Sequence, residues 1–295
     1  MREVLEICAI ALKVSVIAQI FAIGLASTWG HATYLFRRPG LLGRSILSRN
    51  VAAPMLAIVM VKIFPMHPAA AITLAVLSVT PVPPLLPAAH LREGGSLDYP
   101  VGLLVAHSVL GVVTVPATVV FMDWVFEGHA RFSAARVAVL MLQTILAPLF
   151  AGMLASRFVP HPARVIRLLL AIGSAVLIAA AIPMLFPLQG AFRALVGNGT
   201  LLALALFIVV GTAIGHFLGG PVEANRTTLA IATASRHPAV ALGIAATNFP
   251  TQRRLIAAAV VLYLLLRMLL NVPYLRWRRK ALTAAEREEE GVQVV

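Results

Sequence analysis

Residues 233–243, TASRHPAVALG, place an arginine, a histidine and a proline side by side in an otherwise apolar or small run. That run, 227–250, is long enough to cross a bilayer. An arginine at the centre of a spanning helix costs about 3 kcal/mol. Arg236 lies about ten residues from either end, too deep for its side chain to reach the interface easily. We therefore expect Arg236 to bind an anion, with Thr233 and Ser235 available for hydrogen bonds. Arg49 and His237 complete the predicted substrate site.

Proline crowds a second predicted span, where Pro81, Pro83 and Pro84 follow Thr80. So many prolines cannot continue a helix, so the span should open into two half-helices there. Pro238 is well placed as the first residue of a half-helix in the later span. Two interrupted spans, one in each half of the chain, are typical of the substrate site of an inverted-repeat transporter. Two independent proline kinks are the simpler alternative.

The basic residues within the predicted spans lack acidic partners. All 11 acidic residues lie at the termini or in predicted connections, whereas Lys13, Arg49, Arg236 and Arg267 lie within spans. A buried cation must be paired or hydrogen-bonded. Backbone carbonyls could satisfy these side chains, and so could an anionic substrate. Snorkelling explains Lys13 and Arg267 as well as a functional role does.

The amino-acid composition indicates the class of protein in which these arginine, histidine and proline residues lie. Hydrophobic residues make up 60% of the 295, charged residues 12%, and the mean hydropathy is +0.92. These values indicate a polytopic, all-α membrane protein. Hydropathy predicts about nine transmembrane helices, over residues 5–27, 42–64, 69–92, 99–122, 136–155, 164–186, 199–220, 227–249 and 254–275. Residues 1–280 then form one transmembrane unit, and 281–295 form a polar cytoplasmic tail.

The distribution of the arginines along the chain indicates membrane topology and not a nucleic-acid-binding surface. The net charge of +13 is spread over the ends of apolar segments, whereas nucleic-acid binding needs a basic face. More basic residues fall in the connections that would be cytoplasmic if the C-terminus is inside. The positive-inside rule therefore favours an N-terminus outside and a cytoplasmic C-terminus, as expected in the inner membrane of a bacterial cell.

Several stretches resemble the bile acid:sodium symporter family. TPVPPLLPAAHLREGGSLDYPVGLLVAHSVLGVVTVPATVVF is similar to its first crossing segment and following helix, and NRTTLAIATASRHPAVALGIAATNFP to its second crossing segment. FAIGLAS, FRRPG and RNVAAPMLAI resemble its early helices. The resemblance implies two crossed, broken helices. It also implies a core domain from spans 2–4 and 7–9 that moves against a panel domain from spans 1, 5 and 6.

The sequence departs from this family where the family binds sodium. The family's Ser-Asn pair falls on Leu86 and Pro87, and its Ser and Thr on the next helix fall on Pro100 and Leu104. Its Glu, Gln and Asn of the second crossing segment fall on Ala232, Arg236 and His237, and an early-helix Gln falls on Arg49. Sodium needs clustered oxygen ligands. We therefore expect no sodium site, with Arg236 and Arg49 standing in its place.

The sequence thus predicts a secondary transporter of a small or amphipathic organic anion that works by alternating access. His237 could titrate near neutral pH and couple transport to protons, or it could be a hydrogen-bonded packing residue. No protease, metal-ligand or phosphate-loop pattern appears, so we expect no enzyme, catalytic residue, metal or cofactor. A non-transporting membrane sensor or regulator that kept the fold is the alternative.

Overall fold

The structure, a computed structural model, describes residues 2–80, 82–83, 86–87, 96–126, 139, 142–238, 241–242 and 249–293. Within these residues all regular structure is helical. The helices are α1 (Arg2–Ala26), α2 (Trp29–Thr33), α3 (Pro39–Ile46), the π-helix η1 (Leu47–Ala52), α4 (Ala53–Ile63), α5 (Pro68–Val79), α7 (Asp98–Phe126), the π-helix η2 (Leu142–Leu146), α9 (Ala147–Ala155), α10 (Pro162–Leu185), η3 (Phe186–Leu188), α11 (Gln189–Leu195), α12 (Thr200–Leu218), α13 (Glu223–Ala234), η4 (Pro250–Gln252) and α15 (Arg253–Gln293).

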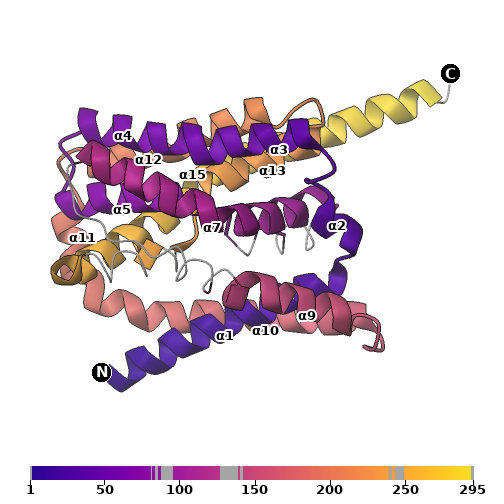
Figure 1. The fold of residues 1–295 in the computed structure, drawn as a ribbon, viewed down its shortest axis with the longest axis horizontal. Coiled ribbons are helices and arrows are strands. Elements are labelled where there is room, and N and C mark those ends of the chain that lie inside the picture. Colours follow the sequence, from indigo (N-terminus) through magenta and orange to yellow (C-terminus); the bar gives the residue numbers. More distant parts are fainter. Residues whose placement is uncertain are drawn as a thin grey trace.

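The described part of the chain contains helices that can cross a membrane. Five segments are long and apolar enough: Pro39–Ile63, Asp98–Val115, Pro162–Ala180, Thr200–Leu218 and Arg253–Arg279. Three shorter apolar helices accompany them: Lys13–Ala26, Pro68–Val79 and Leu142–Ala155. The predicted second span corresponds to the continuous helical segment formed by α3, η1 and α4. The predicted tail continues the last span, because α15 runs to Gln293 and projects beyond the bundle (Figure 1).

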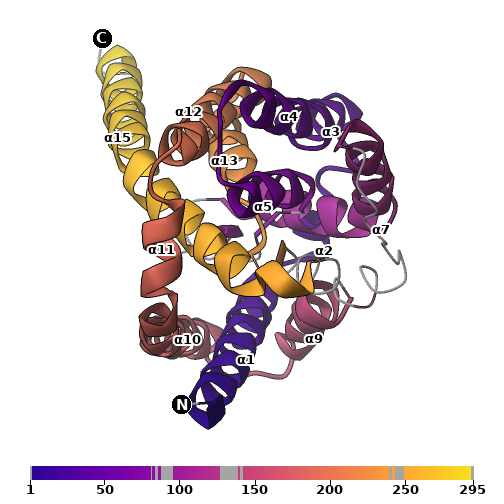
Figure 2. The same ribbon diagram turned by 90° about the vertical axis from the view of Figure 1, so that its left-hand side faces the viewer.

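The helices form two groups. In both views α1, α9 and α10 lie together on one side of the molecule, and α3, α4, α5, α12 and α13 lie together on the other (Figures 1 and 2). The short helices α5 and α13 lie inside the second group, and most of their side chains are buried. Two helices too short to cross a bilayer alone therefore end within the interior of the protein.

Glycine allows α1 and α9 to pack backbone to backbone. A Cβ atom on Gly152 would lie 2.2 Å from the carbonyl oxygen of Phe21, and one on Gly24 would lie 2.2 Å from that of Leu149. Real Cβ atoms do not approach oxygen so closely, so the two helices can touch only because both positions lack a side chain. Small residues at such contacts are typical of helix packing in membranes.

We expect Gly152→Ala to lower the thermal midpoint of the purified protein in detergent. The added methyl group must push α1 and α9 apart, which costs about 1–3 kcal/mol of unfolding free energy. Gly43→Ala is the matched control, because an added Cβ there meets nothing within 4 Å and alanine favours a helix over glycine. Equal midpoints for the two variants would contradict the close approach.

Candidate functional site

Two helices stop where proline follows in the sequence. α5 ends at Val79, and Thr80 is extended with φ −72° and ψ 149°. α13 ends at Ala234, and Ser235 is extended with φ −106° and ψ 134°. A residue before proline is pushed out of the helical region, which explains the extended Thr80 before Pro81 in the sequence.

The prolines expected to interrupt the spans are only partly within the described residues. Pro83 is non-helical, and helical structure is present again at Leu86 and Pro87. Residues 235–237 are non-helical, and Pro238 is helical again. Pro81 and Pro84 lie outside the described residues.

The two interruptions are in direct contact. The backbone N–H of His237 donates to the Thr80 hydroxyl over 3.0 Å, and that hydroxyl donates to the Leu77 carbonyl over 2.8 Å. The carbonyl of Thr80 accepts from Arg49 Nη2 and from Arg236 Nη1, each at 3.5 Å. The ends of α5 and α13 therefore share a polar centre inside the protein.

Arg49 bridges the carboxyl ends of the two helices. Its Nη1 donates to the carbonyls of Ala232 and Ser235, and its Nη2 donates to that of Thr80. The last carbonyls of a helix have no partner within the helix, and the helix end carries partial negative charge. A guanidinium suits this position, and Arg49 is only 2% exposed.

Arg49 lies in a π-helix, which positions its side chain at the two helix ends. Residues Leu47–Ala52 form η1, and Pro54 follows at the start of α4. Proline lacks the N–H that would bond the carbonyl four residues earlier, and a wider turn accommodates the loss. Single π turns are frequent at functional sites.

Arg236 has far fewer contacts than Arg49. It is 1% exposed, its Nη1 reaches the Thr80 carbonyl at 3.5 Å, and its guanidinium carbon lies 5.9 Å from the centroid of the Phe207 ring. Its Nε and Nη2 are buried without a hydrogen-bond partner in the described structure. Arg236 is therefore a buried cation with much of its donor capacity unused.

Helix α15 adds two residues that the sequence did not single out as site residues. The hydroxyl of Tyr263 donates to the Ala234 carbonyl, and Arg267 Nη1 donates to Ser235 Oγ over 2.6 Å. Snorkelling was an open explanation for Arg267, but its side chain points to the interruption of α13. The four-residue spacing puts Tyr263 and Arg267 on one helix face, and that spacing was the signal available in the sequence.

Thr233 and Ser235, which the sequence predicts as hydrogen-bonding groups, lie at the site but already have protein partners, whereas the ring nitrogens of His237 have none in the described structure. Thr233 Oγ1 shares a hydrogen bond of 2.7 Å with Ser48 Oγ and donates to the Leu229 carbonyl over 2.7 Å. Ser235 Oγ accepts from Arg267. These hydroxyls therefore hold the end of α13 in place.

Unpartnered polar atoms concentrate around this centre. In the described residues, the buried side-chain polar atoms without a partner are Arg49 Nε, His107 Nε2, Ser108 Oγ, Arg236 Nε and Nη2, His237 Nδ1 and Nε2, Gln252 Oε1 and Arg267 Nε. Each such group costs about 1–3 kcal/mol, and such groups call for a specific explanation. Most belong to residues at or beside the interruption of α13.

No carboxylate balances the charge of this centre within the described residues. The ion pairs there are His31–Asp98, Arg226–Glu223 and Arg278–Glu223. A hydrogen bond from Arg278 lowers the pKa of the Glu223 carboxyl, but Glu223 begins α13, about 20 Å from Arg236 by the rise of a helix. The two helix ends supply about one elementary negative charge together, against three guanidinium groups. Within the described residues the centre is therefore net positive.

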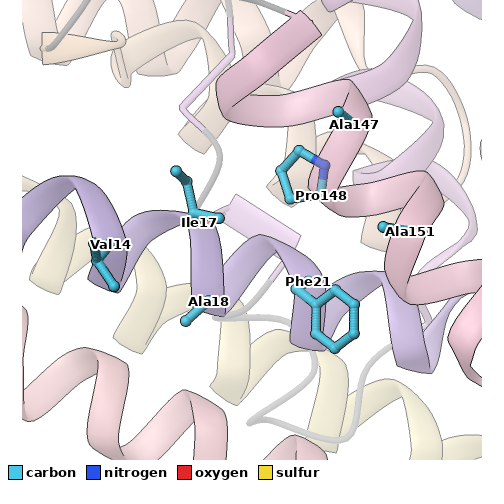
Figure 3. Close-up of a pocket in the computed structure, with 7 residues that line it drawn as sticks. All are labelled: Val14, Ile17, Ala18, Phe21, Ala147, Pro148 and Ala151. Carbon is cyan, nitrogen blue, oxygen red and sulfur yellow. The ribbon is translucent and has the colours of Figure 1, made fainter.

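An open groove between α1 and α9 does not share these features (Figure 3). Its volume of about 570 Å³ is within the range of ligand sites. It is lined by apolar side chains alone: Val14, Ile17, Ala18, Phe21, Ala147, Pro148 and Ala151. The groove has no group that binds a charge. In the described residues no cluster of three or more His, Cys, Asp or Glu side chains could hold a metal ion.

The sequence matches one family over most of its length. The model of the sodium bile acid symporter family matches residues 13–217, and the chain belongs to this family. A search of curated proteins found no match. The protein is therefore an integral membrane protein and a secondary transporter, not an enzyme. The match ends before α13, so the second interruption and Arg236 lie beyond it.

We expect Arg49→Gln to destabilise the protein more than Arg236→Gln. The first change removes the donor of three carbonyls, and losing a hydrogen bond to a charged group costs about 1.5–3 kcal/mol. The second removes one long contact. The thermal midpoint of each variant without ligand measures the difference, with the exposed Lys62→Gln of α4 as control. Equal midpoints for Arg49→Gln and Lys62→Gln would refute the bridging role.

Proposed function

We propose that this member of the sodium bile acid symporter family transports a small or amphipathic organic anion by alternating access, without sodium. The observation that carries the proposal is the net positive centre at the meeting point of α5 and α13. Its unused N–H groups belong to permanent cations that the described structure leaves without a carboxylate. An anion would supply both the missing charge and the missing acceptors.

The two arginines have different roles in this proposal. Arg49 acts as a built-in cation that holds the ends of α5 and α13 together, because both of its terminal nitrogens already bond carbonyls. Arg236 binds the anion, because its Nε and Nη2 lack partners. His237 lies beside it, and an anion there would favour protonation of its ring, which would link proton binding to anion binding.

The hydrogen bonds already formed by the carbonyl oxygens of this centre support transport without sodium. A sodium ion needs several oxygen ligands close together. The carbonyls of Thr80, Ala232 and Ser235 already accept from Arg49, and a second cation beside its guanidinium would be repelled. The residues at this centre therefore do not fit sodium.

The helix arrangement supports the proposed transporter architecture. We assign nine spans, an inverted repeat and two crossed, broken helices that contain α5 and α13. The group of α1, α9 and α10 would be the panel domain (spans 1, 5 and 6), and the other group the core domain (spans 2–4 and 7–9). Residues 1–280 form this unit and 281–295 its polar tail. We place the protein in a bacterial inner membrane with the N-terminus outside and the C-terminus in the cytoplasm.

A membrane sensor or regulator that kept the fold without transporting is the second candidate. The contacts of Arg49, Thr233 and Ser235 favour it, since their polar groups bond the protein itself. In that case Arg236 would serve stability and not binding. Measuring the flux of an organic anion into proteoliposomes separates the two candidates, because only the transporter moves the anion across the membrane.

Sodium should neither stabilise the protein nor drive uptake. A cation that binds the folded protein raises its stability in proportion to occupancy, and this centre has no place for one. Melting temperature and cholate or benzoate uptake should be the same in sodium and potassium chloride at equal concentration. A shift specific to sodium would overturn the sodium-independent part of the proposal.

Arg236→Gln should weaken anion binding while largely preserving the fold. Losing a charge-assisted contact costs about 1.5–3 kcal/mol, or about 10- to 150-fold in affinity. Removing a buried charge should leave the melting temperature unchanged or raised. Affinity for cholate or benzoate and the melting temperature are measured on the same variant. Lost stability with unchanged affinity would favour the sensor candidate.

A further inference from the structure

We infer that the surface where α3 meets the turn between α12 and α13 binds an anionic glycerophospholipid. The phosphodiester of its headgroup lies against Arg44 and Arg226, and its acyl chains lie along the exposed apolar faces of α4 and α12. Arg226 precedes Arg236 by about 15 Å along the helix axis of α13. The lipid surface is therefore separate from the centre described above, and the inference does not rest on the proposed function.

Two guanidinium groups from different helices lie at one glycine. Gly220 is in the turn between α12 and α13, and its φ of 85° is in the left-handed region. A Cβ atom on Gly220 would lie 2.9 Å from Nη1 of Arg44. The carbonyl of Gly220 accepts from Nε of Arg226 over 2.7 Å. The lack of a side chain at Gly220 therefore lets arginines of α3 and α13 approach each other.

A single carboxylate serves the arginines at this surface. One oxygen of Glu223 accepts from Arg226 Nη1 over 2.8 Å, and the other accepts from Arg278 Nη2. Arg278 also donates to the Thr227 hydroxyl over 2.9 Å, so its side chain is bound to α13. Arg44 is exposed and forms no ion pair within the described residues. Three positive charges thus face one negative charge, and a phosphodiester at Arg44 and Arg226 reduces the excess.

Exposed apolar side chains extend from this charged end along two neighbouring helical segments. α12 packs against α3, η1 and α4, and Figure 2 shows α12 beside α4. On the segment from η1 to α4 the exposed apolar residues recur at every fourth position, which puts them on one helix face. The exposed apolar residues are Leu47, Val51, Met55, Val59 and Ile63 on this segment, and Leu202, Val209 and Phe217 on α12.

The length of the apolar face fits a lipid in one leaflet. Met55 follows Arg44 by 11 residues, or about 16 Å by the rise of a helix. Half of the hydrocarbon core of a bilayer is about 15 Å thick. With Arg44 at the level of the phosphates, an acyl chain can therefore follow Leu47, Val51 and Met55 to the middle of the membrane.

The charge of this surface selects among lipids. Phosphatidylglycerol carries a phosphodiester and no cation, and basic side chains at a membrane surface attract such anionic lipids. Phosphatidylcholine adds a quaternary ammonium group, which the excess positive charge at Arg44 and Arg226 repels. A free phosphate ion can use the arginines, but only a lipid also supplies acyl chains for the apolar faces.

The experiment measures lipid binding to the purified full-length protein in detergent, by native mass spectrometry and by lipid-induced melting shifts. The probes are dioleoyl phosphatidylglycerol, dioleoyl phosphatidylcholine, inorganic phosphate, and glycerophosphoglycerol, which is the deacylated headgroup. We expect wild type to bind phosphatidylglycerol at least about 5-fold more tightly than phosphatidylcholine. Inorganic phosphate and glycerophosphoglycerol at the same concentration should not shift the melting temperature.

Arg44 is tested with a matched arginine from the other group of helices. Arg44→Gln should weaken phosphatidylglycerol binding about 5-fold and leave phosphatidylcholine binding nearly unchanged. Its melting temperature without lipid should equal that of wild type, because Arg44 is exposed and has no ion pair in the described structure. Arg167→Gln is the control, because it removes the same charge from an exposed position in the second turn of α10.

Each contrary outcome overturns a defined part of the inference. Equal wild-type affinity for the two lipids, or full phosphatidylglycerol affinity in Arg44→Gln, overturns the lipid site. An equal loss in Arg44→Gln and Arg167→Gln shows that lipid binding follows net charge alone, which also overturns it. If inorganic phosphate or glycerophosphoglycerol raises the melting temperature as much as phosphatidylglycerol does, the arginines bind a free phosphate group and the lipid is wrong. Should Arg44→Gln not fold, the selectivity of wild type among the four probes decides.

Discussion

The bridge from Arg49 to the carboxyl ends of α5 and α13 is the interaction on which the rest of this centre depends. A helix that ends inside a membrane protein leaves carbonyl groups that water cannot reach, and each must find a donor. Here one guanidinium serves carbonyls of both interrupted helices, while Tyr263 serves the carbonyl of Ala234. Without these donors the two helix ends would repel each other. Proline interrupts the helices, and the positive charge between their ends allows the close contact of Thr80 with His237.

A cation that is part of the chain differs from a dissolved one in a single physical respect: it cannot leave. A dissolved ion binds and dissociates, so its gradient can do work on the protein. Arg49 bonds carbonyls at the ends of both α5 and α13, so within the proposed function formation of the site needs no dissolved cation. Within the proposed function, the driving force must then come from the anion itself, or from a proton that accompanies it at His237. The replacement of an exchangeable ion by a side chain would thus alter coupling and leave the fold in place.

How far the sequence could predict this structure depends on the kind of information required. The prolines at 81 and 238 predicted interruptions in these two spans, because proline acts through local backbone geometry. α5 ends at Val79, directly before that region, and α13 ends at Ala234, four residues before Pro238. The depth of Arg236 could likewise be counted along the chain. The partners of each group could not be predicted, since they depend on how helices rotate about their axes. Arg267 was thus compatible with snorkelling, and its four-residue spacing from Tyr263 showed a shared helix face but not that this face meets α13. The π-helix that contains Arg49 has no characteristic amino-acid composition.

The contrast between the two central arginines argues for a binding role at Arg236. A residue retained only to satisfy carbonyls should use its donors as Arg49 does, with both terminal nitrogens bonded. Arg236 makes one contact of 3.5 Å and leaves two buried nitrogens without partners. Burying a charge costs several kcal/mol per ion, and one long hydrogen bond offsets little of this. A glutamine or leucine would be less costly at this position if stability were its sole purpose. Within the proposed function, an anion would offset the unfavourable energy of burying Arg236, which is the differential interaction that a transporter requires.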